Sequence, residues 1–513
     1  MASQKSVTCP TRCVQDVLKR RGYNIMNGGV NGLRSLSKTK QSARIIIVGA
    51  GSAGIAAATR LLSEGFRNVL LLEGESRVGG RVHTIPFADN VVDLGAQWCH
   101  GEQGNVVYET VKDLNLLETT EAHYETFKCV RSNKEVLAED LADSLKNIAF
   151  ASIPERQTEL ADYKGSLGDY ISAKYWRELE KLPPVDKHIA QEFLENFHKF
   201  EASVEAADHL FEVSGQGHLE YWLCEGELLL NWRDKGYKSF LRLLMKSKPC
   251  QPDDLGILKG RVLCNKRITE INWRDGQQVL VRCWDGEILT ADHVICTVSL
   301  GVLKERHQTM FVPALPEAKV RAIKSLKLGT VDKLFLEYAV APLPADWPGF
   351  ACLWLAEDLA ELRGSERFWL ESVFGFYPVS YQPRLLQGWI IGEHARHMET
   401  LTEQEVLEGL QWLFRKFLPI AVPEPVRLLR TQWHANPNFR GSYSFRTTQA
   451  DEMRTGAWDL EAPLCEVDGK PRLQFAGEAT HKHFYSTVHG AVETGWREAA
   501  RLSDYYRART ARI

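Results

Sequence analysis

The residues whose types and spacing most clearly indicate chemistry are three glycines that follow a short apolar run. Gly49, Gly51 and Gly54 come after Ile45–Val48 and before an alanine-rich stretch, a pattern typical of a strand, a tight turn and a helix. Gly49 allows the turn, Gly51 lets a pyrophosphate approach the backbone, and Gly54 lets the helix pack closely on the strand. The alternative, a glycine-rich surface turn, leaves these flanking elements unexplained.

Glu73 supplies the next functional group. It ends a second apolar run, Val69–Leu72, and lies 22 positions beyond Gly51. At that spacing an acid can accept hydrogen bonds from the ribose hydroxyls of a bound dinucleotide. The glycines and this acid together predict a dinucleotide site near the start of the chain.

Two further glycine turns indicate a long cofactor. The segment 77–81, Arg-Val-Gly-Gly-Arg, lies just after Glu73, and the segment 473–480, Leu-Gln-Phe-Ala-Gly-Glu-Ala-Thr, predicts a short strand that enters a glycine turn. A nicotinamide-binding fold does not explain the second glycine pair, because its chain would continue directly into the next helix. We therefore expect a cofactor with a second phosphate contact, buried between distant parts of the chain.

Lys333 and His100 are the candidate catalytic groups. The run 331–338 predicts a strand in which Lys333 shares one face with Val331 and Phe335. A lysine between large apolar neighbours either extends its ammonium from a sheet edge or is held for chemistry. His100 could be a structural residue or a hydrogen-bonding group for an amine. The residue types alone leave both choices open.

The remaining elements can be predicted only coarsely. We expect a helix at 240–246, helical segments within 153–208, and a helix at 403–418. One strand should cover 262–272 and pair with 279–283 in a hairpin, and a buried strand should cover 294–298. The helical segments should form a layer separate from the nucleotide unit.

Composition excludes several classes of protein. The chain has 513 residues, 44% hydrophobic and 25% charged, which is typical of a folded, soluble protein of two to four domains. The 63 basic and 66 acidic residues give a net charge of −3, which argues against a nucleic-acid partner. Eleven scattered cysteines without a CxxC pair indicate no disulfide framework and no metal site. No apolar run is long enough to cross a membrane.

The first 41 residues differ from the rest in charge. They contain eight basic residues and one acid. We expect residues 1–41 to be a flexible basic leader, with a targeting peptide as the alternative.

The motifs resemble those of the flavin-containing amine oxidases. The similarity includes the first glycine turn and the segments 77–81, 297–304 and 477–480, and it covers about residues 44–506. Further segments at 97–101, 436–444 and 483–491 are similar to those of animal spermine and N1-acetylpolyamine oxidases. One departure is Ser299, where relatives usually have proline; this change could loosen a turn but alters no reacting group.

The resemblance implies an α/β fold, a Rossmann-like FAD-binding domain of the amine oxidase type with an interleaved α+β substrate-binding domain. Residues 42–120, 236–312 and 430–513 would bind FAD, and residues 121–235 and 313–429 would bind the substrate. The FAD should be noncovalent, because Ser442 stands where relatives with a tethered flavin have a cysteine. The FAD contacts implied are Gly49, Gly51, Ser52, Gly54, Glu73, Arg81, Gly95, Ala96, Gln97, Trp98, Ile268, Trp433, Gly477, Glu478, Thr487 and Val488.

The same resemblance assigns roles around the reacting centre. Lys333 would reach the flavin N5 through a water, and His100 would hydrogen-bond an amine in the substrate tunnel. Tyr443 and Thr487 would form facing walls beside the flavin, so that only one wall is aromatic. Trp433 would pack on the isoalloxazine, although any of these aromatic side chains could instead belong to the core.

Three other residues complete the set. Ser486 is expected to contact the substrate. Glu220 is a candidate for binding a distal ammonium, with a solvated helix charge as an equal alternative. Cys99 is expected to be a small buried hydrophobe rather than a redox partner.

The function expected is that of an FAD-dependent polyamine oxidase. It would remove a hydride from a carbon beside a secondary amine of spermine or an N-acetylated polyamine, with O2 as acceptor and H2O2 as product. Spermidine or putrescine would be released with an aminoaldehyde, and unmodified spermine is the favoured substrate. The alternatives are a histone-lysine demethylase, for whose helical module and insertion the chain has no room, and a catalytically silent flavoprotein scaffold, against which the intact Lys333 and glycines argue.

Partners and location follow from the same reasoning. We expect a monomer that binds a small polyamine and O2, without nucleic acid or membrane. The cytoplasm is the expected location. The peroxisome is the first alternative, because the terminal Ala-Arg-Ile at 511–513 loosely resembles a peroxisomal tripeptide, and the mitochondrion is the second.

Overall fold

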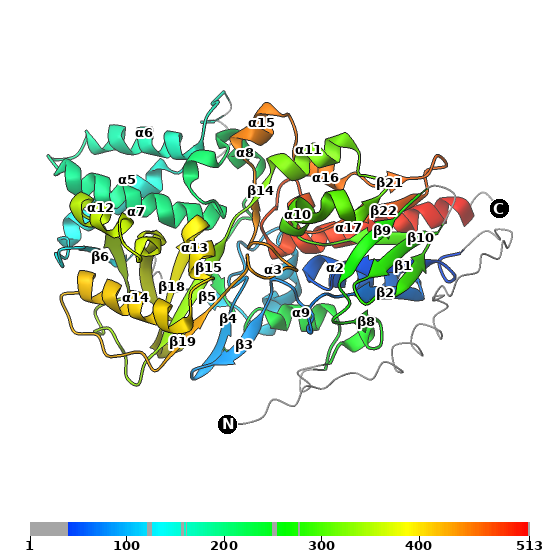
Figure 1. The fold of residues 1–513 in the computed structure, drawn as a ribbon, viewed down its shortest axis with the longest axis horizontal. Helices are drawn as coiled ribbons and strands as arrows, with labels where there is room; N and C mark the ends of the chain where they lie inside the picture. Colours follow the sequence, from blue (N-terminus) through cyan, green and yellow to red (C-terminus); the bar gives the residue numbers. More distant parts are fainter. Residues whose placement is uncertain are drawn as a thin grey trace.

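Two six-stranded sheets organise the chain, one in each of two lobes (Figure 1). The computed structural model describes residues 39–120, 126–154, 159–160, 162–248, 254–274 and 278–510. The predicted leader, apart from its last three residues, and the Ala-Arg-Ile end lie outside the described residues.

The nucleotide lobe is built on a mainly parallel sheet. Strand β1 (Arg44–Val48) passes through the glycine turn into helix α2 (Ser52–Ser63) and then into β2 (Asn68–Leu72), which pairs with β1 in parallel. The strand order is β21-β22-β12-β1-β2-β8. The other strands are β8 (Val262–Leu263), β12 (His293–Cys296), β21 (Leu464–Cys465) and β22 (Pro471–Phe475). Every residue of β1 and β12 is buried, which explains the apolar runs 45–48 and 294–296 within them.

The C-terminal helix α17 (Val488–Thr510) covers this sheet beside α2 (Figure 1). Close approach of the two helices requires Gly495, where a Cβ would lie 2.2 Å from the carbonyl oxygen of Ala53. The end of the chain is therefore packed against its first helix.

The prediction of one strand over 262–272 is wrong. Strand β8 belongs to the parallel sheet, whereas β9 (Ile268–Asn272) belongs to a four-stranded sheet of order β11-β10-β9-β13. Between them Asn265 adopts a left-handed φ of +56°, and the Lys266 N–H donates to the Glu73 carbonyl at 2.7 Å. The predicted hairpin is correct, because β10 (Val279–Cys283) pairs antiparallel with β9. The other two strands are β11 (Ile288–Ala291) and β13 (Phe311–Val312).

The second lobe contains a mixed sheet between two layers of helices. Its order is β19-β15-β18-β17-β16-β6. Helices α5, α6 and α7 pack on one face, and α12, α13 and α14 pack on the other. The bounds are β6 (Lys128–Arg131), α5 (Glu139–Ser152), α6 (Leu167–Leu179), α7 (Lys187–Glu205), β15 (Val331–Glu337), β16 (Phe350–Leu353), α12 (Ala356–Arg363), β17 (Val373–Val379), β18 (Gln382–Ile391), α13 (Gly392–Met398), α14 (Glu403–Phe417) and β19 (Arg427–Arg430). The helix predicted at 403–418 is α14, which begins with a capping box of Thr402 and Glu405.

The remaining helices and strands are short. They are β3 (Thr84–Phe87), β4 (Asn90–Asp93), α3 (Val106–Val111), β5 (Glu118–Thr119), α8 (Gly215–Glu220), β7 (Leu230–Asn231), α9 (Lys238–Leu244), α10 (Leu300–Met310), α11 (Glu317–Ser325), β14 (Lys327–Leu328), β20 (Ser444–Phe445), α15 (Thr448–Glu452) and α16 (Ala457–Glu461). Helix α11 does not follow the expected division into domains, which assigned residues 313–429 to the substrate-binding domain. Its Ala322 and Ile323 lie in the core of the nucleotide lobe.

Two further findings concern the described residues as a whole. The cysteines within them are all free thiols. None of the helices they form is long and apolar enough to cross a membrane.

Candidate active site

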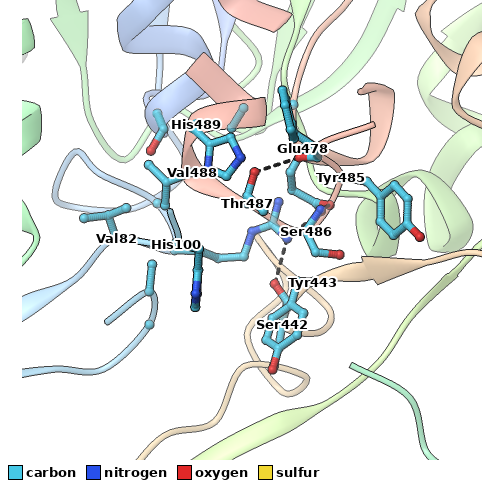
Figure 2. Close-up of a pocket in the computed structure, with 18 of the residues that line it drawn as sticks. Val82, His100, Ser442, Tyr443, Glu478, Tyr485, Ser486, Thr487, Val488 and His489 are labelled. Atoms are coloured by element: carbon cyan, nitrogen blue, oxygen red, sulfur yellow. Dashed lines mark hydrogen bonds and ion pairs between the residues drawn. The ribbon is translucent and has the colours of Figure 1, made fainter. Parts of the chain in front are cut away.

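A cavity of about 1490 Å³ lies between the lobes. Its wall includes the β1–α2 turn, residues 79–82 and 94–98, and the start of α17 from the nucleotide lobe, together with side chains of α7, β15 and β18. A volume above the roughly 300–1,000 Å³ of ordinary ligand sites gives room for both a dinucleotide and a substrate. Figure 2 shows part of this wall, with His100, Tyr443 and Thr487 among the labelled side chains.

The glycine turn is shaped for a phosphate group. Gly49 has φ +101°, and a Cβ there would lie 2.4 Å from Thr297 Oγ1. A Cβ at Gly54 would lie 2.1 Å from the Gly49 carbonyl oxygen, whereas a Cβ at Gly51 would meet no atom nearer than 3.9 Å. Gly51 is also the N-cap of α2 and provides no side chain for its first N–H groups. Open space over uncapped amides fits the pyrophosphate of a dinucleotide.

Glu73 does more than the ribose contact expected of it. Its Oε2 accepts a hydrogen bond from the Ala50 N–H at 2.6 Å, and its Oε1 accepts one from the Glu75 N–H at 2.8 Å. Burial raises the pKa of the Glu73 carboxyl in spite of these two bonds. The side chain therefore fixes the glycine turn, and each oxygen keeps a second lone pair for a ribose hydroxyl.

Arg81 and Glu478 join the two ends of the chain at the cavity wall. Arg81 Nη1 donates to Glu478 Oε1 at 2.9 Å and to the Ser442 carbonyl at 2.7 Å. The other oxygen of Glu478 accepts the Ser486 N–H at 2.9 Å and the Ser444 hydroxyl. Ser442, Glu478 and Ser486 are labelled in Figure 2. This network holds the segments 442–444 and 478–486 beside the turn formed by Gly49, Gly51 and Gly54, which we call the glycine cradle.

Lys333 lies on β15 with its amine at the cavity wall. Its Nζ donates to the Asp93 carbonyl at 2.7 Å, the Gly95 carbonyl at 2.9 Å and Gln97 Oε1 at 2.7 Å. Burial lowers the pKa of Lys333 to about 7, against the opposing charge of Asp93. Charged Lys333 uses all three N–H groups on the protein, whereas neutral Lys333 has a lone pair to accept a water hydrogen.

One ring nitrogen of His100 forms a hydrogen bond within the protein. Its Nδ1 is 2.9 Å from the Leu228 carbonyl, so this nitrogen carries the hydrogen and Nε2 is the acceptor in the neutral ring. Burial lowers the pKa of His100, which favours that neutral form. The ring can therefore accept a hydrogen bond from an amine in the cavity.

The aromatic and hydroxyl groups expected beside the flavin have defined partners. The Tyr443 hydroxyl donates to the Ser203 carbonyl on α7. Thr487 Oγ1 accepts the Gly490 N–H at 3.0 Å and donates to the Phe484 carbonyl at 2.7 Å. The Thr487 hydroxyl proton is thus not available to a ligand.

Two buried acids position the segment that carries Trp433. Asp332 Oδ1 accepts the Thr431 hydroxyl at 2.7 Å and the Trp433 N–H at 3.2 Å, and the Lys333 N–H donates to Thr431 Oγ1 at 2.8 Å. Glu399 accepts the next two backbone N–H groups at 2.8 and 2.6 Å. The lysine and the tryptophan are therefore held by one hydrogen-bond network.

The cavity brings together most of the residues predicted from the sequence. Gly54 lies behind the wall, as its packing role requires. Cys99 is fully buried and does not line the cavity, as expected. The predicted residues that line it are His100, Lys333, Tyr443, Ser486, Gly49, Gly51, Ser52, Glu73, Arg81, Gly95, Ala96, Gln97, Trp98, Ile268, Trp433, Gly477, Glu478, Thr487 and Val488.

The structure contradicts the role expected of Glu220 in binding a distal ammonium. It lies on α8, forms an ion pair with Arg446, and does not line the cavity. Helix α7 instead contributes two acids to the cavity wall, Glu201 and Glu205, which the sequence analysis missed. Charge and helical spacing cannot tell these glutamates apart, because all three occur in polar helical segments.

Two other residues change the sequence-based interpretation. Ser299 does not loosen its turn: it caps α10 by accepting the Val302 N–H at 3.2 Å, and its hydroxyl donates to the Phe439 carbonyl. His489 also lines the cavity (Figure 2), although only its surrounding segment attracted attention in the sequence. Burial lowers the pKa of His489 to about 3, so this ring is neutral.

Comparison with known proteins identifies the family. The profile of the family described as "Flavin containing amine oxidoreductase" matches residues 52–503. "Peroxisomal N(1)-acetyl-spermine/spermidine oxidase" of Bos taurus is 31% identical, over 92% of this chain and 97% of that protein. "Polyamine oxidase 1" of Oryza sativa subsp. japonica is also 31% identical, over 90% of this chain and 98% of that protein.

Two other comparisons bear on fold and class. "Lysine-specific histone demethylase 1 homolog 2" of Arabidopsis thaliana is 29% identical over 95% of this chain and 62% of that protein. The solved structure of wild-type putrescine oxidase bound to putrescine has a TM-score of 0.63 and 20% identity, and the match covers 90% of this chain and 98% of that one. This structural likeness confirms the predicted fold class.

The family match, the fold and the glycine cradle agree on the cofactor, and Ser442 offers no thiol to tether it. This chain belongs to the flavin-containing amine oxidoreductase family and is an FAD-dependent amine oxidase that holds its flavin noncovalently.

Proposed function

We propose that this enzyme oxidises polyamines at a carbon beside a secondary amine of spermine or an N-acetylated polyamine. The resulting imine is hydrolysed to an aminoaldehyde and a shorter amine. Bound FAD supplies the redox chemistry, accepting a hydride and passing the electrons to O2, which becomes H2O2. The named activities of the Bos taurus and Oryza sativa relatives support this substrate class.

The observation that carries the proposal is the composition of the cavity beyond the glycine cradle. Its wall there combines large apolar side chains with the carboxyl groups of Glu201 and Glu205. Apolar walls suit the methylene spacers of a polyamine, and carboxyl groups suit its ammonium groups. Benzylamine, with one amine and no second cation, would bring no second ammonium to these carboxyl groups. The apolar residues are Phe150, Ile153, Phe200, Val204, Leu219 and Trp222.

Two side chains act on the reacting amine and on water. The neutral His100 ring accepts a hydrogen bond at Nε2 and orients the substrate amine. Neutral Lys333 accepts a hydrogen from a water and holds it for hydrolysis of the imine or for the oxygen reaction. A lysine with a pKa of about 7 is partly neutral at physiological pH, which suits this task.

The test uses the purified yellow protein. Spermine, N1-acetylspermine, spermidine and benzylamine are added separately, and H2O2 release and anaerobic bleaching of the flavin are measured. We expect turnover with at least one polyamine and a preference for spermine. Turnover of benzylamine alone would refute the proposal, and a flavin that no amine bleaches would favour the silent scaffold.

A second candidate is oxidation of a methylated lysine, favoured by the similarity to the Arabidopsis thaliana demethylase. The same bleaching assay with a dimethyl-lysine peptide distinguishes the two. Bleaching by the peptide but not by spermine would replace the polyamine assignment.

For location we infer the cytoplasm, with the peroxisome as the alternative that the name of the Bos taurus relative supports. Imaging of the chain tagged at either end decides between them.

A further inference from the structure

Asp332 and Glu399 are two buried carboxyl groups that meet behind the cavity wall. Asp332 lies on β15 and is 0% exposed, and Glu399 directly follows α13 and is 5% exposed. Asp332 accepts the Trp433 N–H, and Glu399 accepts the N–H groups of the next two residues, so the backbone brings the two acids together. Among the described residues, neither carboxyl group forms an ion pair. Two adjacent carboxylates at such a place would repel each other without compensation.

The hydrogen-bond pattern locates a proton between the two acids. Asp332 Oδ1 accepts the Thr431 hydroxyl at 2.7 Å and the Trp433 N–H at 3.2 Å, and each oxygen of Glu399 accepts a backbone N–H. Asp332 Oδ2 is buried, no N–H or O–H group of the described residues donates to it, and the Asp332 carboxyl group is in hydrogen-bond contact with that of Glu399. Such a contact requires a proton on one of the acids, and Oδ2 is the oxygen that is free to carry it. Burial, and then the charge of Glu399, accordingly raise the pKa of Asp332 well above its ordinary value.

The cation that acts on both carboxyl groups does not replace this proton. Arg430 of β19 attracts them through space, but its guanidinium donates to the carbonyls of Met398 and Leu401. Its charge is also shared with Glu403 and Glu405 at the start of α14. One positive charge therefore faces four acids, which favours keeping the buried pair at a single negative charge.

The other titratable groups on the surrounding elements have partners of their own or are neutral. The Lys333 amine is directed into the cavity, where it donates to three oxygens. Arg396 of α13 pairs with Asp208 at 2.7 Å. Burial lowers the pKa of His434, so its ring brings no charge.

The acid pair holds the backbone that carries Trp433. The Lys333 N–H donates to Thr431 Oγ1, whose hydroxyl donates to the pair, and the N–H groups of 433–435 donate to the pair directly. The Trp433 ring lines the cavity, packs against Phe439 with centroids 5.3 Å apart, and lies beside Gly95, where a Cβ would be 3.3 Å from Trp433 Cζ2. The Gly95 carbonyl in turn accepts a hydrogen bond from Lys333 Nζ.

We propose that Asp332 and Glu399 share one proton and, as a pair with a single negative charge, position the Trp433 ring against the bound flavin. Neither acid lines the cavity, so both are positioning residues that act through Trp433. If the pair lost its proton, the two negative charges would separate and displace the N–H groups that they hold.

The first experiment is infrared difference spectroscopy of the FAD-loaded enzyme at pH 7. A protonated carboxyl group absorbs apart from carboxylates and amides, and we expect Asp332→Asn to lose one such band. Asp208→Asn is the matched control, because the Asp208 carboxylate pairs with Arg396 and should contribute no such band. An Asp332→Asn spectrum that retains every protonated-carboxyl band of wild type would overturn the shared proton.

The pH dependence of stability measures the same proton. Folded Asp332 keeps a proton that the unfolded side chain releases above the ordinary pKa of 3.8, so wild type should lose stability relative to Asp332→Asn as pH rises. In denaturant titrations between pH 5 and 7 we expect the ratio of the two unfolding constants to change by up to about tenfold per unit. A constant ratio would contradict the shared proton.

Visible circular dichroism of the bound flavin tests the positioning role. Asp332→Asn should resemble wild type, because the carboxamide accepts at Oδ1 and donates from Nδ2 to Glu399. Glu399→Gln should alter the flavin signal, because its NH2 group would face a backbone N–H, and Asp332→Ala should alter it as well. A flavin signal unchanged in both variants would overturn the positioning role. The infrared and denaturant measurements use only the isosteric variant, so poor folding of the other two does not remove the test.

The inference concerns the FAD-bound enzyme and is separable from the proposed function. None of the three measurements needs a substrate. A lost carboxyl band and a disturbed flavin signal, in an enzyme whose flavin no polyamine reduces, would support the acid pair and refute the polyamine reaction.

Discussion

Lys333→Met removes an amine that lies at the cavity wall while roughly keeping the side-chain volume. The variant loses the hydrogen bonds from Nζ to Asp93, Gly95 and Gln97, at 2.7, 2.9 and 2.7 Å. At about 1 kcal/mol for each net hydrogen bond, this loss costs about 3 kcal/mol. The fall in pKa from 10.5 to about 7 shows that burying the ammonium costs about 5 kcal/mol, which the variant no longer bears. The two effects oppose each other, so the fold should persist.

The effect on catalysis should be larger than the effect on stability. A positioned acid–base group typically contributes about 10²–10⁴-fold to a rate. We therefore expect Lys333→Met to retain FAD and to slow flavin reduction or reoxidation by about a hundredfold. Rapid-mixing absorbance measures the two half-reactions separately, first with spermine under anaerobic conditions and then with oxygenated buffer.

Lys319→Met is the matched control. The Lys319 amine is also buried and donates hydrogen bonds to three carbonyl oxygens, at 2.9, 2.7 and 2.8 Å. Burial lowers its pKa to about 7, as for Lys333, but Lys319 does not line the cavity. Its substitution should leave both half-reactions near wild-type rates. Wild-type rates in both half-reactions of Lys333→Met would remove Lys333 from the catalytic residues.

The pH dependence of stability gives a second readout for both lysines. Each folded-state pKa of about 7 lies below the ordinary 10.5, so between these values the unfolded chain binds more protons. Each lysine therefore makes the protein more stable as pH rises through this window, by up to about 1.4 kcal/mol per unit. Each variant should lose that slope in denaturant titrations between pH 7 and 9, and an unchanged slope would contradict the burial argument.

Four other substitutions test the nucleotide site and its supports. Gly51→Ala should lower flavin content with little change in melting temperature, because a Cβ there has no neighbour within 3.9 Å in the protein. Gly54→Ala should instead lower the melting temperature, because its Cβ would lie 2.1 Å from a carbonyl oxygen. Glu73→Ala should lose FAD on dialysis, and its free energy of unfolding should fall by about 1–3 kcal/mol for each backbone N–H left unpaired. An undiminished flavin content after dialysis would count against the nucleotide assignment. Ser299→Ala should lose about 1 kcal/mol of stability in denaturant titrations, with unchanged turnover, because it removes a helix cap.

Short-range patterns account for what the sequence predicted well. The glycine turn, its strand and its helix follow from steric demands on neighbouring residues, so Gly49, Gly51 and Gly54 could be assigned without a structure. The hairpin of 268–283 and helix α14 likewise follow from local hydrophobic periodicity and capping. Where a local signal was missing, as at the left-handed Asn265 that separates β8 from β9, the prediction was wrong.

The tertiary structure decided which polar groups meet. The three acceptors that surround the Lys333 amine come from residues 93–97, more than 230 positions away. Glu201 and Glu220 both occur in polar helical sequence, and only the packing of α7 and α8 places the first at the cavity and the second on Arg446. Burial and pairing of a charge depend on groups brought together from distant segments, and residue type and spacing along one helix do not contain that information.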